Sequence, residues 1–203
     1  MKKEEFSFSG LNKGYINRQG KAVLQVNPDM ELTLQQVHDY IVSDAAKAET
    51  ERLRQIKDHD KAQEFKKLNL RVALFGGLFS KRNAQSLYKA SGLMVIDIDG
   101  LESEQEARRI NQLLIKDRRI NVALNFLSPG GKGCKNVLGI DVSMGLDYKA
   151  YFNWVYRYLL FEYGIEIDVS GSDICRACYL PHDPQCYINP NFLTNNQNGK
   201  DNF

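Results

Sequence analysis

The chain has 203 residues, of which 43% are hydrophobic and 26% charged, enough apolar residues for one domain with a core. The formal net charge of +2 indicates no particular class of partner, and no apolar run reaches the 18 residues typical of a transmembrane helix. The first residues lack the apolar stretch of a signal peptide, so we expect a cytoplasmic protein whose four cysteines are free thiols.

The N-terminal third predicts two short strands and two helices. The strands are expected at 6–9 and 22–26, before a break at 27–29. From residue 32 the apolar residues recur with a helical period, and Thr33 is the expected N-cap. A second helix is expected over about 45–68, where interspersed charges of both signs indicate a solvated face without chemistry.

Residues 69–90 are basic and contain no acidic side chain. Lys81 and Arg82 are the candidate contacts to a nucleic-acid phosphate backbone, because such contacts are made by lysine and arginine. A local excess of positive charge without function is the alternative. The stretch 71–77 predicts a strand that enters a tight turn.

An apolar run that ends in two carboxylates occupies residues 93–100 and predicts a buried strand. Residues two apart on a strand share a face, so Asp97 and Asp99 point the same way while the alternate residues point into a core. Two neighbouring carboxylates repel each other unless a cation lies between them, and Mg²⁺ prefers oxygen ligands. A solvated strand end without a metal is the alternative for this motif taken alone.

The remaining elements follow in a regular order. The patterns predict a helix at 103–116, strands at 121–127 and 136–140, a helix at 148–163 and a short strand at 176–180. Ser103 with Glu106 matches a capping box, Asp147 is the N-cap of the next helix, and Gly164 ends it.

Together with the strand at 93–100, this order is that of the ferredoxin-like βαββαβ unit. The first strand of that sheet lies between the third and the fourth, so Asp97 and Asp99 are expected beside 135–136 and 173–176. The predicted fold is α+β, with a ferredoxin-like core at 69–188, a strand-and-helix extension at 1–68 and a flexible tail at 189–203.

Three further clusters have two interpretations each. The glycine-rich turn at 130–135 carries two lysines and predicts an anion site or an ordinary hairpin turn. The spacing of Cys175, Cys178, His182 and Cys186 is compressed for a zinc site, and free thiols are favoured. The aromatic helix at 148–163 predicts core packing, with base stacking as the alternative.

Four motifs in this order resemble a known group of proteins. They are FGGLFSKR at 75–82, SGLMVIDIDG at 91–100, SPGGKGCK at 128–135 and DICRACYLPHDP at 173–184. With the hydrophobic-Asp pair at 167–168, they resemble the archaeo-eukaryotic primase superfamily. The resemblance is closer to the primase-like, or VirE N-terminal, domains of bacterial mobile elements.

This resemblance implies metal-dependent nucleotidyl transfer on a nucleic-acid template. Asp97 and Asp99 match the metal-binding pair and Asp168 the third metal carboxylate, with Asp173 as its competitor. Nucleotide-binding positions are implied at Ser128, Lys132, Lys135 and Arg176. The implied cofactor is Mg²⁺ or Mn²⁺. The implied partners are a nucleoside triphosphate, single-stranded DNA or a primed template, and a helicase-like ATPase, with no membrane.

Two other functional classes stay open. A phosphohydrolase of the haloacid dehalogenase type also has a nucleophile in a hydrophobic strand ending in D-x-D-G, although Leu101 departs from that pattern. A non-catalytic module that binds single-stranded nucleic acid in a replication or transfer complex is the second alternative. It predicts retained binding without metal-dependent turnover.

Overall fold

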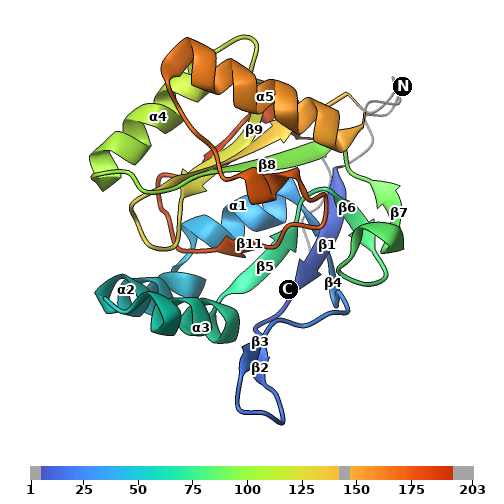
Figure 1. The fold of residues 1–203 in the computed structure, drawn as a ribbon, viewed down its shortest axis with the longest axis vertical. Coiled ribbons are helices and arrows are strands. Elements are labelled where there is room, and N and C mark those ends of the chain that lie inside the picture. Colours follow the sequence, from blue (N-terminus) through green and yellow to red (C-terminus); the bar gives the residue numbers. More distant parts are fainter. Residues whose placement is uncertain (1–5, 142–146, 194–203) are drawn as a thin grey trace, which may run out of the picture.

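The computed structural model describes residues 6–141 and 147–193, which form a mixed α/β fold with several antiparallel sheets (Figure 1). The first sheet has the order β11 (Cys178–Leu180), β5 (Arg71–Leu74), β1 (Ser7–Leu11) and β4 (Met30–Thr33). The second has the order β12 (Tyr187–Ile188), β9 (Val122–Leu127), β10 (Cys134–Gly139) and β8 (Leu93–Ile98). Two hairpins pair β2 (Tyr15–Ile16) with β3 (Ala22–Val23) and β6 (Gly77–Phe79) with β7 (Leu87–Ala90).

The described residues contain five α-helices. They are α1 (Leu34–Val42), α2 (Lys47–Gln55), α3 (His59–Asn69), α4 (Glu104–Lys116) and α5 (Tyr148–Tyr163). The predicted N-caps Thr33, Ser103 and Asp147 all accept a backbone hydrogen bond from the first turn of their helices. Gly164 ends α5 in the left-handed region, with φ of 66°, as expected of a C-terminal glycine.

The second sheet is covered on both faces. Helices α4 and α5 lie on one face (Figure 1), where Met94, Ile96 and Ile98 of β8 pack against apolar residues of both helices. On the other face, Val95 belongs to a core shared with α1 and the first sheet. The predicted alternation along β8 is therefore confirmed, and it leaves the end of the strand to carry polar side chains.

The predicted position of β8 inside the sheet is wrong. Among the described residues β8 pairs with β10 alone, and the predicted final strand, β11, pairs with β5 of the first sheet. The chain at 168–172 instead curls into a 3₁₀ turn, because the Asp168 side chain accepts the Ser170 backbone N–H. In the part of the chain that the structure describes, a single backbone bond, from Asp168 N to Asp97 O at 2.8 Å, joins this turn to β8.

Two other predictions need correction. The helix expected over 45–68 is interrupted at residues 56–58, where Asp58 N-caps α3 by accepting the Lys61 N–H. The tail expected from residue 189 first forms a 3₁₀ turn at Pro190–Phe192, and the buried Phe192 ring lies 5.3 Å from that of Phe6. The rest of that predicted tail, 194–203, lies outside the described residues. Within the described ranges, none of the helices has the length and apolar character to cross a membrane.

Candidate functional site

Three carboxylates predicted from the sequence come together at the end of β8. One oxygen from each of Asp97, Asp99 and Asp168 lies within 4.8 Å of the others. Asp97 lies in β8, and Asp99 directly follows the last residue of that strand. The turn at 168–172 brings Asp168 alongside both of them. Asp173 is not a member of this group, which favours Asp168 as the third carboxylate.

Lys135 lies directly opposite Asp97 in the β8–β10 register, and its Nζ forms an ion pair with Asp97 Oδ2. The lysine side chain is only 9% exposed. Burial acts to lower the pKa of Lys135, but the charge and hydrogen bond of Asp97, together with the neighbouring Cys178 and Asp99, outweigh it, and the pKa is raised. Lys135 is therefore a fixed positive charge inside the carboxylate group.

Asp168 is also occupied by protein partners. Its Oδ2 accepts hydrogen bonds from Arg176 Nη2 at 2.9 Å and Ser170 Oγ at 2.5 Å, and Oδ1 accepts the Ser170 N–H. Burial acts to raise the pKa of Asp168, but these hydrogen bonds and the Arg176 charge hold it below its usual range. Arg176 thus pairs with Asp168 and not with Asp173, the carboxylate three residues before it in the sequence.

Asp99 differs from the other two carboxylates, because it makes no ion pair with any described residue. Burial, followed by the charge of Asp97, raises the pKa of Asp99, while Lys135 and Lys66 act in the opposite sense. Lys66 projects from α3, and its own pKa is lowered by burial and by Lys135. No motif in the sequence singles out Lys66, which lies among the mixed charges of a helix predicted to be solvated.

The glycine-rich loop lies against the carboxylates. It is closed by hydrogen bonds from Ser128 N to Gly133 O at 2.8 Å and from Gly131 N to Ser128 O at 2.9 Å. A Cβ at Gly133 would lie 2.6 Å from Ile98 O and 2.9 Å from Asp99 Oδ1. Glycine is therefore required here by close approach of the loop to β8, a constraint separate from anion binding.

A cleft of about 820 Å³ runs along this site. Its walls include seven residues predicted as site residues, which are Arg82, Asp97, Asp99, Ser128, Lys132, Lys135 and Arg176. Asp168 and the exposed Lys81 are not among the residues that line the cleft. Sequence reasoning missed three contributors from α3, Gln63, Lys66 and Lys67, and the apolar end formed by residues 22–26.

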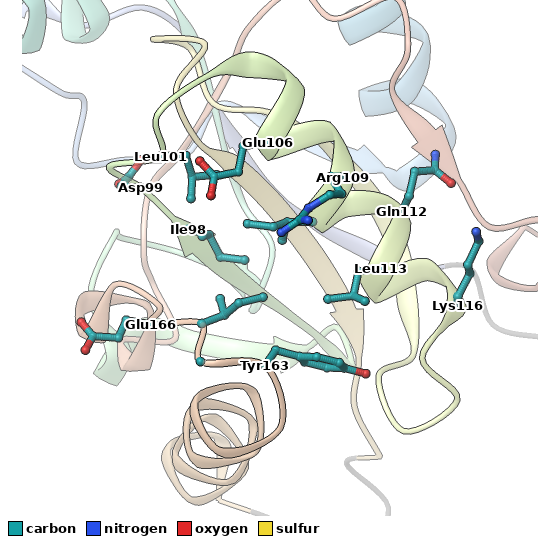
Figure 2. A pocket seen from close by; sticks show the side chains of 13 residues that line it. Ile98, Asp99, Leu101, Glu106, Arg109, Gln112, Leu113, Lys116, Tyr163 and Glu166 are labelled. Atoms are coloured by element: carbon teal, nitrogen blue, oxygen red, sulfur yellow. The ribbon is translucent and has the colours of Figure 1, made fainter.

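A second hollow of about 750 Å³ lies between α4 and the segment after α5 (Figure 2). Figure 2 shows Asp99 and Glu106 at one end and Tyr163 at the other, with Leu113 and Arg109 on α4. It shares Asp99 with the cleft but none of the lysines predicted to bind a nucleotide. Asp99 therefore stands between two hollows.

The geometry of the carboxylates fits a divalent cation. Asp97 Oδ1 is buried and has no hydrogen-bond partner among the described residues, an arrangement that costs free energy unless a ligand satisfies the oxygen. Carboxylate oxygens are the ligands that Mg²⁺ and Mn²⁺ prefer. Asp97 and Asp99 are the residues that would hold the ion.

The zinc interpretation finds no support in the geometry. All four cysteines are buried, and they do not form a ligand group with His182 in the described part of the chain. Cys178 and Cys186 belong to the core shared by the two sheets, whereas Cys175 packs in a separate core with Leu11, Val72 and Leu74. Burial raises the pKa of the Cys178 thiol to about 12, which disfavours the thiolate that zinc requires.

The aromatic helix divides between the two interpretations. Phe152 is buried in the core beneath α5, whereas Trp154 is 45% exposed and Phe161 is 91% exposed. The Trp154 and Tyr158 rings are stacked with centroids 5.6 Å apart. Core packing therefore accounts for only one side of α5.

Comparison with known proteins gives one match. The family model of the BT4734-like N-terminal domain matches residues 65–188. No curated protein and no solved structure matches the chain. The matched residues include Lys66, the three carboxylates, the glycine-rich loop, Lys135 and Arg176, so the whole charged site lies inside the family's domain. The chain therefore belongs to the BT4734-like N-terminal domain family.

Proposed function

We propose that this protein is a primase-like domain that transfers nucleotides to a nucleic-acid end in a reaction dependent on Mg²⁺ or Mn²⁺. The observation that carries the proposal is the grouping of Asp97, Asp99 and Asp168, with a buried and unpartnered oxygen on Asp97, at the wall of a cationic cleft. Carboxylates beside cationic side chains are the combination that phosphoryl transfer requires.

The charge of the cleft suits a triphosphate. Its walls carry six cationic side chains, Lys66, Lys67, Arg82, Lys132, Lys135 and Arg176, against three carboxylates, Asp97, Asp99 and Asp173. This excess of three positive charges attracts a polyanion, and exposed Lys132 is free to turn toward it. When bound, the divalent cation would neutralise triphosphate oxygens and favour deprotonation of the attacking hydroxyl.

The order of elements supports a relation to the primase core in part. Strand β8, helix α4, strands β9 and β10 and helix α5 follow one another as in a ferredoxin-like unit, with both helices on one face of the sheet. The fourth strand of that unit is replaced at β8 by the turn at 168–172. The partners we propose, which are single-stranded DNA or a primed template, a nucleoside triphosphate and a helicase-like ATPase, follow from the resemblance of the sequence motifs to primase-like domains.

One observation favours a non-catalytic nucleic-acid-binding module as the second candidate. Two of the three carboxylates already pair with protein cations, Asp97 with Lys135 and Asp168 with Arg176. A site neutralised in this way can exist to hold the fold together while the remaining lysines bind phosphates. The two candidates differ in whether metal ions change the chemistry of a bound nucleotide.

The decisive experiment measures nucleotide incorporation on a primed template with Mg²⁺ or Mn²⁺, for the wild type and for Asp99→Asn. Asp99 is the informative position, because it has no ion pair to lose and its substitution relieves repulsion with Asp97. We expect turnover and metal binding to disappear with thermal stability unchanged or slightly higher. Asp97→Asn is less informative, because it removes the partner of the buried Lys135.

Asp173→Asn is the matched control, because Asp173 lines the same cleft but lies outside the carboxylate group. We expect this variant to retain metal binding. Turnover that survives Asp99→Asn contradicts the proposal. Salt-sensitive DNA binding without turnover in the wild type would establish the binding module instead. A trapped aspartyl-phosphate would indicate the phosphohydrolase.

A further inference from the structure

We propose that the Lys135 ammonium permanently occupies one cation position of the carboxylate group, so that the site takes a single divalent ion where a paired-metal site would take two. This inference rests on the proposed function, since it concerns the same metal site. It follows from which carboxylate oxygens are free and from where Lys135 is anchored.

The free oxygens limit the number of ions. Asp97 Oδ2 is paired with Lys135, and Asp168 Oδ2 receives both Arg176 and Ser170. Asp168 Oδ1 accepts the Ser170 N–H. The buried Asp97 Oδ1 and the Asp99 carboxylate are left without an ion pair among the described residues. One ion can share these two carboxylates, but a second would need oxygens that Lys135, Arg176 or Ser170 already holds.

Lys135 has no route away from the site. Its backbone is fixed between two strands, opposite Asp97 on one side and Phe126 on the other. Its side chain is nine-tenths buried, and the charged carboxylates Asp97 and Asp99 are its electrostatic partners. Withdrawing the ammonium would leave a buried charge without compensation on Asp97, which is more costly than keeping the pair.

A buried ammonium beside the ligands also weakens metal binding. It repels a divalent ion bound to Asp97 and Asp99, and at ion-pair distance this repulsion changes a binding constant by roughly tenfold or more even at the dielectric constant of water. Lys135 therefore sets both the number of ions and their affinity. The Lys135 ammonium also supplies one positive charge to the side of the site where we propose that the triphosphate binds.

The test is Mn²⁺ binding to the full chain without nucleotide, measured from the free Mn²⁺ signal in electron paramagnetic resonance. We expect one ion per chain in the wild type, and a dissociation constant at least about tenfold lower in Lys135→Met. Lys132→Met is the matched control, because it removes the same charge from an exposed position of the same cleft. We expect its dissociation constant to fall by less than about threefold.

The outcomes separate this inference from the proposed function. Two ions in the wild type, or equal effects of the two substitutions, overturn the inference and leave the proposed function intact. Absence of Mn²⁺ binding in every protein overturns both. If Lys135→Met unfolds without metal, Mn²⁺ should refold it, as followed by circular dichroism, and failure to refold overturns the inference. The wild-type stoichiometry remains decisive in every case.

Discussion

The ion pair between Arg108 and Asp183 should be a large single contribution to stability. Asp183 is fully buried and receives Arg108 Nη1 and Nη2 at 2.8 and 2.7 Å, which joins α4 to the segment before β12. The same carboxylate accepts the backbone N–H groups of Leu127 at 2.8 Å and Gln185 at 3.0 Å. Asp183→Ala removes all four bonds at once.

The expected loss follows from those contacts. Removing one partner of a buried pair costs about 3–5 kcal/mol, and the Leu127 N–H would remain buried without an acceptor. Arg108 is 21% exposed and keeps Glu104 at 3.2 Å, so its charge stays partly compensated. We therefore expect a loss near the lower limit, about 3 kcal/mol of a total of roughly 5–15 kcal/mol.

Urea denaturation at neutral pH, followed by circular dichroism, measures this loss. Glu104→Ala is the matched control, because it removes the other carboxylate partner of Arg108 from a half-exposed position. We expect the control to lose at most about 0.5 kcal/mol. A loss below about 1 kcal/mol in Asp183→Ala, or equal losses in the two variants, would refute the reasoning.

Two further predictions concern the loop and the end of α5. Gly133→Ala should weaken Mn²⁺ binding and cost about 1–3 kcal/mol, because its Cβ would meet Ile98 O and Asp99 Oδ1, whereas Gly130→Ala meets nothing within 4 Å and should change neither quantity. Equal Mn²⁺ affinity in the two glycine variants would contradict the close approach. Burial acts to raise the pKa of Asp117, but hydrogen bonds from Tyr158 and Tyr163 hold it below its usual range. The wild type should therefore be more stable than Asp117→Asn above the unfolded pKa of aspartate, and this advantage should be lost as the pH falls through the folded pKa. Thermal denaturation of both proteins between pH 7 and 2 measures the difference. A difference in stability that does not change with pH would exclude the linkage.

Local signals in the sequence predicted the parts of the site that depend on short spacings. The period of two along β8 placed Asp97 and Asp99 correctly, because a strand buried on both faces leaves only its end to carboxylates. Lys135 could be placed because an antiparallel neighbour reverses the chain and brings its first residues to that end. Helix caps such as Ser103 could be predicted, because a cap forms a hydrogen bond with a residue only two or three positions away in the sequence.

The pairing of strands that are far apart in the sequence could not be predicted in the same way. The sequence 176–180 has the composition of a strand, but nothing in it indicates whether its partner is β8 or β5. Asp168 nevertheless reached Asp97, through a turn and one backbone bond where a strand was expected. Lys66 was missed because a lysine among mixed charges has no pattern that separates a buried head group from a solvated one.

The first sheet has a consequence for truncated forms of the protein. Its inner strand β1 lies between β5 and β4, and Phe8 and Leu11 within it are fully buried. A fragment that begins at residue 65, where the family match begins, would lack both β1 and β4. The edge of β5 would then be open to pairing with other chains, and Phe75 would lose its ring contact with Phe8. Such a fragment should aggregate. Soluble expression of a protein that carries the charged site therefore requires strands β1 and β4, which precede the family match.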